Sequence, residues 1–165
     1  MKKVFLLILS SVLLSVFLFG CAQEPTPVYI SSIVTSEEIT NTARESFVGS
    51  AASSEVDDVQ CEVNYDTLTY KLFYNSMFTE DIINDEVIAI WEQYATDVAE
   101  ASIEQFKSIN DEIQKKNANT FFMAPILRFE FYNSDGSILF YETSKIVMYS
   151  SDSVEDWNLN IENPA

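Results

Sequence analysis

The side chains that most often carry catalysis or hold a metal are scarce in this sequence. Among its 165 residues there is no histidine, and the only cysteines are Cys21 and Cys61. The absence of histidine excludes a Ser-His-Asp triad, a Cys-His pair and every zinc signature that contains histidine. Two cysteines cannot supply the four thiolates of a cysteine-only zinc site. With three glycines in the whole chain, neither a Walker loop nor a Rossmann fingerprint can be written.

Carboxylates are the one abundant set of reactive groups, with 26 Asp and Glu residues. A glycosidase needs two carboxylates flanking a sugar bond. Because the acidic residues are so numerous, the sequence does not identify any particular pair. The clusters Asp57-Asp58 and Asp152-x-x-Glu155-Asp156 carry the oxygen ligands that calcium prefers, yet neither has EF-hand spacing. We therefore predict solvated acidic loops, no catalytic residue, no metal and no cofactor. An enzyme that uses carboxylates alone stays open as a third alternative.

An apolar leader precedes the first cysteine. Lys2 and Lys3 are followed by an uncharged run over residues 4–20, at the lower edge of the length that spans a bilayer. A basic start, a short apolar centre and small residues at the exit are typical of a secretory signal peptide. The alternative is an uncleaved membrane helix followed by an incidental cysteine.

The end of the leader, Leu18-Phe19-Gly20-Cys21, resembles the lipobox of bacterial lipoproteins. Leu18, Gly20 and Cys21 match that motif, whereas a residue smaller than Phe19 usually stands at the second position. In this class the cysteine receives a thioether-linked diacylglycerol and the leader is cut just before it. Acyl chains anchor a protein by burying methylenes, at about 0.8 kcal/mol each. The resemblance therefore implies a protein anchored through Cys21 on the outer side of the cytoplasmic membrane, or on an outer membrane.

The charge balance bounds the partners. The leader holds two of the nine basic residues and none of the 26 acidic ones, so residues 21–165 carry 7 − 26 = −19. Such a charge repels nucleic-acid phosphates and anionic lipid headgroups. It favours cations, cationic peptides or a basic protein surface, although solubility outside the cell is the simpler explanation of an acidic surface. With Cys21 lipidated, Cys61 has no partner for an internal disulfide.

Residues 21–55 are predicted to be a lipidated tether that contains a short helix. The segment begins as a polar, proline-containing stretch of the kind that separates a lipid from a domain. Thr35 and Glu38 have the spacing of a capping box. Ile39, Ala43 and Phe47 then fall on one face of a helix over residues 35–50, and Gly49 could end it.

Alternation begins at Asp58 and predicts a hairpin. With Asn64-Tyr65-Asp66-Thr67 as its turn, the opposing pairs on one side are Val63–Leu68, Cys61–Tyr70 and Val59–Leu72. The other side is polar, as expected of a half-buried antiparallel pair. This pattern predicts that Cys61 is a buried structural thiol.

A long helix is predicted over residues 80–117, with Thr79 as its N-cap. Apolar residues recur from Val87 to Ile113 at a spacing of three or four, and Asn117 could end the helix. A helix of this length overhangs a strand of about twelve residues. We therefore expect a bend or break near Ser108-Ile109-Asn110.

A second hairpin follows, turning at Asn133-Ser134-Asp135-Gly136, where Gly136 supplies a positive φ. With Asn133 opposite Ser137, Arg128 faces Glu142 across the strands as an ion pair. The core face is predicted to be apolar, formed by Phe121, Met123, Leu127, Phe129, Phe131, Leu139, Tyr141, Val147 and Tyr149. The opposite face mixes charged with apolar residues.

The fold class predicted from these elements is α+β, with two antiparallel hairpins joined by a long helix packed on the sheet (ββαββ). The domain would span residues 56–150, behind a signal peptide (1–20) and the tether (21–55). Residues 151–165 would be an acidic tail. The pattern does not decide between one sheet and two.

Two function classes follow. The first is a non-catalytic lipoprotein that binds an envelope protein, a peptide or a glycan through the mixed face of the second hairpin. Aromatic anchors with a polar rim are typical of such interfaces, and the candidate residues are Arg128, Glu130, Tyr132, Ile138 and Phe140. Ordinary coverage of that face by residues 28–50 or by the tail is the alternative explanation. The second class is a small-ligand binder, with a pocket between helix and sheet that holds Trp91, Tyr94 or Tyr141.

Overall fold

The computed structural model describes residues 24–48 and 55–157, which adopt an α+β fold. The helices are α2 (Ser36–Phe47) and α3 (Asp85–Lys116), with single 3-10 turns η1 (Ile30–Ser32) and η2 (Glu80–Ile82). The strands are β1 (Thr26–Val28), β2 (Val56–Asn64), β3 (Thr67–Tyr74), β4 (Thr120–Phe122), β5 (Ile126–Tyr132), β6 (Leu139–Met148) and β7 (Ser153–Asp156). Within these residues, no helix has both the length and the apolar character that a membrane crossing requires.

The two hairpins belong to one five-stranded sheet of order β2-β3-β5-β6-β7. β2–β3 and β5–β6 are antiparallel pairs, while the central pair β3–β5 is parallel. A parallel pair needs a long crossover, and α3 provides it. A separate parallel pair, β1–β4, joins the start of the described chain to the segment that follows α3. The order β2-β3-α3-β5-β6 is the predicted one, whereas β1, β4 and β7 extend it.

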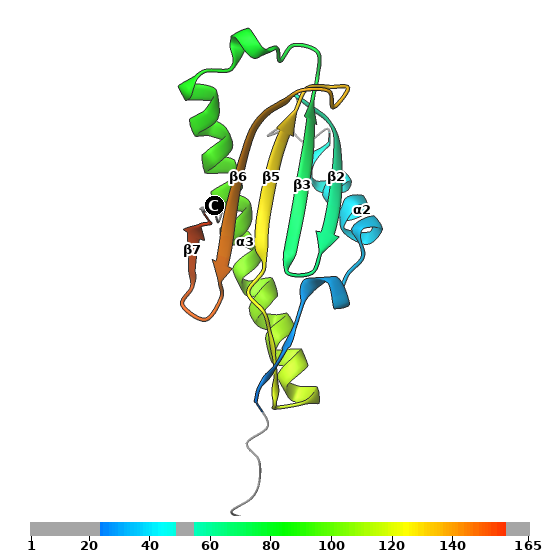
Figure 1. The fold of residues 1–165 in the computed structure, drawn as a ribbon, viewed down its shortest axis with the longest axis vertical. Helices are drawn as coiled ribbons and strands as arrows, with labels where there is room; N and C mark the ends of the chain where they lie inside the picture. The colour runs from blue at the N-terminus through cyan, green and yellow to red at the C-terminus, as the bar shows by residue number, and fades with distance from the viewer. Residues whose placement is uncertain (1–23, 49–54, 158–165) are drawn as a thin grey trace, which may run out of the picture.

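One face of the sheet packs on α3, and the molecule has two layers there (Figure 1). Leu127, Phe129 and Phe131 of β5 point to α3 and are fully buried. Trp91 of α3 stacks on Phe131 with ring centroids 4.8 Å apart. Burying aromatic and aliphatic side chains of this size contributes about 1.5–3 kcal/mol each, so the interface between α3 and β5 is the centre of the core.

The first hairpin has the predicted register. Val63 pairs with Leu68, and Asn64 with Thr67, which leaves a two-residue turn. Tyr65 in that turn has a φ of 58°, and its ring stacks on Tyr29 at 3.9 Å. Cys61 is buried with 4 % of its surface exposed, so its predicted place in the core is confirmed.

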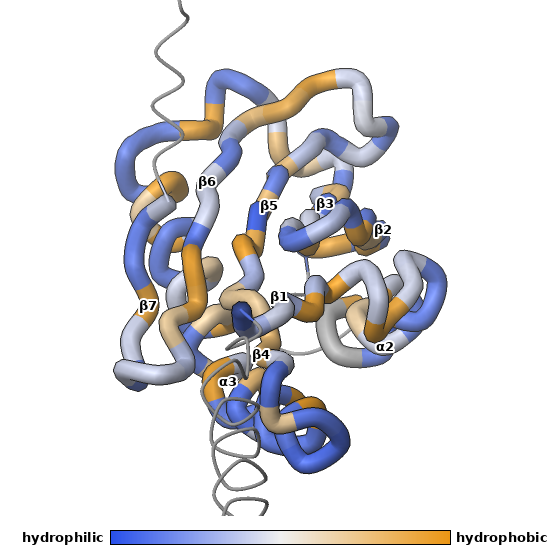
Figure 2. Tube along the Cα trace, turned by 60° about the horizontal axis from the view of Figure 1, so that its bottom comes forward, coloured by the Kyte–Doolittle hydropathy of each residue, from blue (hydrophilic) through white to orange (hydrophobic). Residues whose placement is uncertain are grey.

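Helix α2 lies along the outer edge of β2 (Figure 2). Its hydroxyls bond the backbone groups that β2 does not share with β3: Ser36 Oγ accepts from Val63 N–H at 2.9 Å, and Thr40 Oγ1 accepts from Cys61 N–H at 2.9 Å. One turn further, Arg44 pairs with Asp58 at 2.7 Å. The spacing of four residues keeps these side chains on one face of the helix. An edge strand covered in this way offers no template to another chain.

The N-terminus of α2 has the predicted capping box. The Thr35 side chain accepts from the backbone N–H of Glu38, and the Glu38 carboxylate accepts from the backbone N–H of Thr35. Ala43 faces the core, and Ile39 packs against it. The side chain of Phe47 and residue Gly49 lie outside the described residues.

The predicted start of the long helix is wrong, and where a bend or break was predicted the helix does not break. Thr79 precedes only the single turn η2, and α3 begins after Asn84, whose Oδ1 accepts from the N–H groups of Glu86 and Val87. An asparagine with extended φ/ψ satisfies two of the unpaired N–H groups of a helix, which explains why the helix starts there. α3 then runs without interruption through Ser108-Ile109-Asn110. Asn110 instead accepts from the N–H of Phe122 in β4 at 2.9 Å.

The predicted register of the second hairpin is also wrong. Gly136 has the expected positive φ of 73°, but Asn133 pairs with Ile138 through its N–H, and Tyr132 with Leu139. A bulge then shifts the pairing, so Phe131 faces Tyr141 and Glu130 faces Glu142. Phe122 rather than Phe121 is fully buried.

The bulge also moves Phe140 to the other side of the sheet. At a bulge, two residues of one strand lie opposite one residue of the partner strand, and this changes the direction in which the nearby side chains point. The Phe140 ring lies beside Trp91 of α3, with centroids 6.3 Å apart, and packs against the core. Leu139, predicted to lie in the core, is 42 % exposed. The prediction that Phe140 shares a face with Arg128 is therefore wrong.

The structure places parts of the predicted tether and tail within the fold. β1 and η1 pack on the domain, with Ile30 only 4 % exposed, and α2 covers β2. At the other end, β7 pairs with β6 over residues 153–156. The leader, Cys21 and the rest of the tail lie outside the described residues.

Candidate binding site

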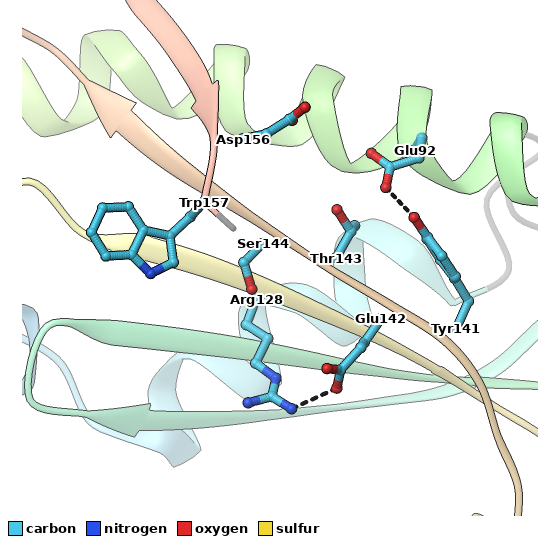
Figure 3. Close-up of a pocket in the computed structure, with 8 residues that line it drawn as sticks. All are labelled: Glu92, Arg128, Tyr141, Glu142, Thr143, Ser144, Asp156 and Trp157. Atoms are coloured by element: carbon cyan, nitrogen blue, oxygen red, sulfur yellow. Dashed lines mark hydrogen bonds and ion pairs between the residues drawn. The ribbon is translucent and has the colours of Figure 1, made fainter. Parts of the chain in front are cut away.

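Charged side chains gather where β7 ends beside β6. Eight residues line a recess of about 250 Å³ there (Figure 3), namely Glu92, Arg128, Tyr141, Glu142, Thr143, Ser144, Asp156 and Trp157. They come from α3, β5, β6 and β7. Because successive side chains of a strand alternate between faces, residues 141 and 143 lie on the α3 side and residues 142 and 144 on the opposite side.

Lys145 is the buried centre of this region. Its residue surface is 3 % exposed, and its Nζ lies 2.6 Å from Glu92 Oε2 and 2.6 Å from Asp156 Oδ1. The Tyr141 hydroxyl donates to the other oxygen of Glu92. These contacts join α3, β6 and β7 through one ammonium group, so the network holds the helix against the edge of the sheet.

The charges in this network are fixed rather than poised for proton transfer. Burial lowers the pKa of Lys145, but the hydrogen bonds from its ammonium group to Asp156 and Glu92 outweigh that effect and hold the pKa above its ordinary value. Burial likewise raises the pKa of Glu92, and hydrogen bonds from Lys145 and Tyr141 bring it below the usual range. Ser144 points to the opposite face from Lys145, so the two cannot form a Ser-Lys pair. The recess therefore offers charged contacts and no activated nucleophile.

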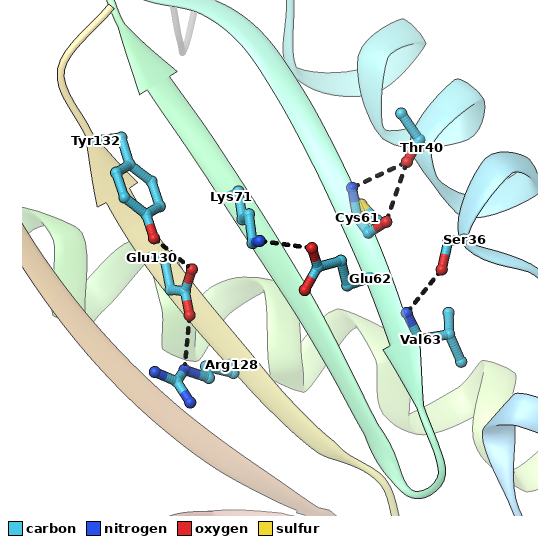
Figure 4. A network of polar contacts seen from close by, with 9 residues as sticks. All are labelled: Ser36, Thr40, Cys61, Glu62, Val63, Lys71, Arg128, Glu130 and Tyr132. Atoms are coloured by element: carbon cyan, nitrogen blue, oxygen red, sulfur yellow. Dashed lines mark hydrogen bonds and ion pairs between the residues drawn. The ribbon is translucent and has the colours of Figure 1, made fainter. Parts of the chain in front are cut away.

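The face of the sheet opposite α3, here called the outer face, carries an ordered array of ion pairs (Figure 4). Arg128 Nε lies 2.9 Å from Glu130 Oε1, and its Nη2 lies 2.6 Å from Glu142 Oε2. Lys71 binds Glu62 at 2.6 Å in the first hairpin. Glu130 and Glu142 face each other across the strands, and like charges in that position repel. Arg128 lies between them and removes the repulsion.

Tyr132 completes this array at one end. Its hydroxyl donates to Glu130 Oε2 at 2.9 Å, and its ring stacks on Phe73 at 5.5 Å. Burial, and then the bond to Glu130, raise the pKa of Tyr132 to about 12. Glu130, 7 % exposed, thus has a partner on each oxygen. The array is preorganised, which lowers the entropic cost of presenting it to a partner.

Of the five residues predicted to form a binding face, the structure brings three together. Arg128, Glu130 and Tyr132 form the array on β5. Ile138 lies in the loop that joins β5 to β6 and is 36 % exposed, while Phe140 lies on the α3 side. The ion pair predicted between Arg128 and Glu142 forms diagonally, because Arg128 is directly opposite Ser144.

The predicted acidic clusters contact basic side chains. Asp58 binds Arg44, Asp152 binds Lys107, and Asp156 binds Lys145. Within residues 24–48 and 55–157, no three acidic or cysteine side chains are grouped closely enough to hold a metal ion. Burial raises the pKa of the Cys61 thiol to about 11, so it is protonated at neutral pH and weakly nucleophilic.

A second hollow, of about 280 Å³, lies between α3 and the first hairpin. Its walls include Tyr74, Phe78, Trp91 and Tyr94, with Glu55 at its margin. The sequence singled out Trp91 and Tyr94 for such a position. It did not single out Lys145, although Lys145 has the same parity along β6 as Tyr141 and Val147, which were assigned to the core. The alternation of side chains along β6 was therefore the signal that could have predicted Lys145 on the core face.

Comparisons of this chain with protein-family models, with curated proteins and with solved structures yield no match.

Proposed function

We propose that this chain is a non-catalytic, lipid-anchored binding protein of the bacterial cell envelope, exported and held through Cys21, that docks a partner protein on its outer face. The observation that carries the proposal is the contrast between the two faces of the sheet. α3 covers one of them, whereas none of the described helices or strands lies over the outer face (Figure 1).

A protein partner fits the composition of the outer face best. Arginine and aromatic residues are enriched at protein interfaces, and here Arg128 is fixed between two carboxylates while Tyr132 stands at one end. Trp157, 39 % exposed, continues the outer face beyond β7. The backbone N–H of Trp157 donates to the carbonyl of Ser144 at 2.8 Å, which holds this residue in line with the sheet.

The anchoring is tested by expressing the full chain in a bacterium and measuring intact mass and membrane fractionation, with Cys21→Ala as the comparison. We expect the wild type to lack residues 1–20, to gain the mass of a diacylglycerol, and to follow the membranes only when Cys21 is present. A full-length mass, with Cys21→Ala still in the membrane fraction, would show an anchoring helix and reject lipidation.

Docking is tested in the same cells by site-specific photo-crosslinking. A benzophenone amino acid at Ser144, on the outer face, should give one discrete adduct, whereas the same group at Lys116, exposed at the C-terminal end of α3, should give none. Glu142→Lys should weaken the Ser144 adduct, and the matched reversal Glu112→Lys on α3 should not. Equal adducts from Ser144 and Lys116 would reject the outer face as the docking surface.

A small-ligand binder is the second candidate, supported by the aromatic hollow that contains Trp91 and Tyr94. Pockets for small molecules combine apolar walls with a few polar groups, and Glu55 is the one carboxylate of this lining. Trp91 fluorescence, measured in a Trp157→Phe variant so that the other tryptophan of the chain does not contribute, would report occupancy of this hollow.

A further inference from the structure

Two hollows lie along the same side of α3, on the face of the sheet opposite the outer face. The first, described above, is bordered on α3 by Val87, Ile90, Trp91 and Tyr94. The second has a volume of about 340 Å³ and lies between α3 and α2, lined by Ile39, Thr42, Ala43, Tyr70, Val98, Ala101, Ser102 and Gln105. We call the two together the helix-side trough.

The spacing of the α3 residues shows that the hollows are aligned. Residues 87, 91, 94, 98, 101 and 105 advance by three or four, so they form one stripe on the helix. On β3, Tyr70 and Tyr74 are four residues apart and point to the same face. From Val87 to Gln105 the stripe is about 27 Å long at 1.5 Å per residue. The trough therefore has the length of a five-turn helix.

The exposed margin of the trough is acidic. Ala99 and Phe106 come directly after the lining residues Val98 and Gln105, and both are buried in the core. The residues that come directly before lining residues of α3 therefore lie on the solvent side of the helix. Among them are Glu86, Asp97 and Glu104. All three are exposed, and Glu104 also binds Lys107 at 3.0 Å. Between Lys71 and Lys107 the chain contains no lysine or arginine.

Large apolar side chains are exposed at one end of the trough. Met77 is 66 % exposed, Ile82 45 % and Ile90 62 %. Ile90 lines the first hollow, and Met77 adjoins Phe78, which also lines it. Exposed apolar residues that gather beside a hollow mark an interaction surface more often than scattered ones do.

We propose that the helix-side trough binds a basic amphipathic helix of a partner protein. An amphipathic helix lays its apolar face into a groove, and its basic flanks would meet the acidic margin. A second copy of this chain is disfavoured as the partner, because two chains that each carry a net charge of −17 repel each other. Nucleic acid is disfavoured for the same reason. This surface is distinct from the outer face, so its test does not depend on docking there.

The test uses the full chain, expressed in a bacterium and reconstituted in phosphatidylcholine nanodiscs in whatever processed form it takes. The probe is a fluorescent 18-residue peptide with Leu and Lys placed to form an amphipathic helix, titrated by anisotropy against loaded and empty nanodiscs. Two control peptides replace Lys with Glu, or keep the composition in scrambled order. We expect binding of the first peptide only, with affinity that falls as salt is added.

Two matched pairs of variants locate the binding. Ala101→Trp fills the second hollow, and we expect it to weaken binding at least about tenfold, since a blocked groove loses its apolar contacts. Ala89→Trp, also at an exposed position of α3 but on a side of the helix that faces away from the trough stripe, should change nothing. Asp97→Lys should weaken binding about threefold or more at low salt, whereas Glu155→Lys on β7 should not.

Each contrary result overturns the proposal. Equal effects of Ala101→Trp and Ala89→Trp would place the peptide elsewhere, and equal binding of the scrambled peptide would reduce the interaction to charge alone. If the chain retains its leader and binds the peptide only after residues 1–20 are removed by a protease, the trough holds the chain's own basic leader. Absence of binding by any form rejects a basic helical partner.

Discussion

Lys145 is the most buried charged side chain among the described residues, and it shows how a charge can be kept in a core. Its ammonium group is shared between Glu92 of α3 and Asp156 of β7, and a buried charge without partners would cost several kcal/mol. Tyr141 donates to the same Glu92 carboxylate. The network therefore fixes the position of α3 relative to β6 as well as the charge state of each group.

At the scale of the residue, we predict that Lys145→Met lowers the free energy of unfolding by about 3 kcal/mol, because the change leaves Glu92 half-buried with an unpaired charge. Adding Glu92→Gln removes that charge and keeps an acceptor for Tyr141. The double variant should regain about 1–2 kcal/mol of the loss. Urea titrations of the wild type, both single variants and the double variant measure the coupling, and strictly additive effects would refute it.

The same network predicts how stability depends on pH. The pKa of Glu92 is lower in the folded protein than in the unfolded chain, so its contribution is present at neutral pH and is lost as the pH falls through that lowered value. The pKa of Lys145 is raised, so its contribution is lost only as the solution becomes strongly alkaline. In the double variant, the decline in melting temperature between about pH 5 and pH 3 should be shallower than in the wild type. An unchanged decline would mean that other carboxylates account for it.

Individual residues were predictable where the strand pattern is regular and unpredictable where it is interrupted. Val59, Cys61 and Val63 keep the predicted pairing because β2 and β3 alternate without a break from residue 58. The predicted face of Phe140 is wrong because the residue type gives no indication of the bulge that turns its ring toward Trp91. Arg128 still reaches Glu142 despite the wrong register, since a long guanidinium side chain spans a diagonal pair.

At the scale of the element, the start of α3 distinguishes two capping residues that look alike in the sequence. Asn84 accepts from two backbone N–H groups, whereas Thr79 makes no side-chain cap to η2. Acidic residues follow both positions, so the pattern that predicted a start after Thr79 fits Asn84 equally well, although Asn84 was not predicted. Phe78 and Ile83, on either side of η2, both pack against the core.

We predict that Asn84→Ala lowers the free energy of unfolding by about 1 kcal/mol, the usual cost of losing a helix cap. Thr79→Ala should cost less than about 0.5 kcal/mol, as surface substitutions generally do. Thermal or urea unfolding of the two matched variants checks this difference. A larger loss for Thr79→Ala would move the helix start back to the position suggested by the sequence.

At the scale of the whole molecule, the α+β class and the two hairpins around a long helix could be read from the periodicity of the chain. The sheet order could not, because the pairing of β3 with β5 depends on contacts between residues about 60 apart. The position of α2 could not be predicted either. Its Ser36 and Thr40 hydroxyls bind backbone N–H groups of β2, and no side-chain pattern reveals which backbone groups are unpaired. For the candidate sites, the sequence indicated Arg128, Glu130 and Tyr132 on the outer face, and Trp91 and Tyr94 in one hollow of the trough. It indicated neither the recess nor the second hollow.

The net charge of −17 acts on the folded molecule as a whole, because like charges repel most in the compact state. Raising NaCl from about 10 mM to about 300 mM shortens the Debye length from about 30 Å to below 8 Å. We predict a rise in melting temperature of about 2–5 °C, corresponding to about 1 kcal/mol. Sucrose at matched osmolality controls for solute exclusion. A melting temperature that is independent of salt would show that repulsion between the acidic side chains does not destabilise the folded state.

The small β1–β4 pair has a further meaning if Cys21 carries the lipid. Thr26 N–H donates to the carbonyl of Asn119 at 2.9 Å, and only four residues separate Cys21 from Thr26, a span of at most about 18 Å. With the lipid on Cys21, the short pair would fasten the C-terminal end of α3 close to the bilayer, and α3, 32 residues and about 48 Å long, would carry its first turn away from it. The domain would stand upright on the membrane, with Met77, Ile82 and Ile90 at its summit, where a molecule arriving from outside meets them first.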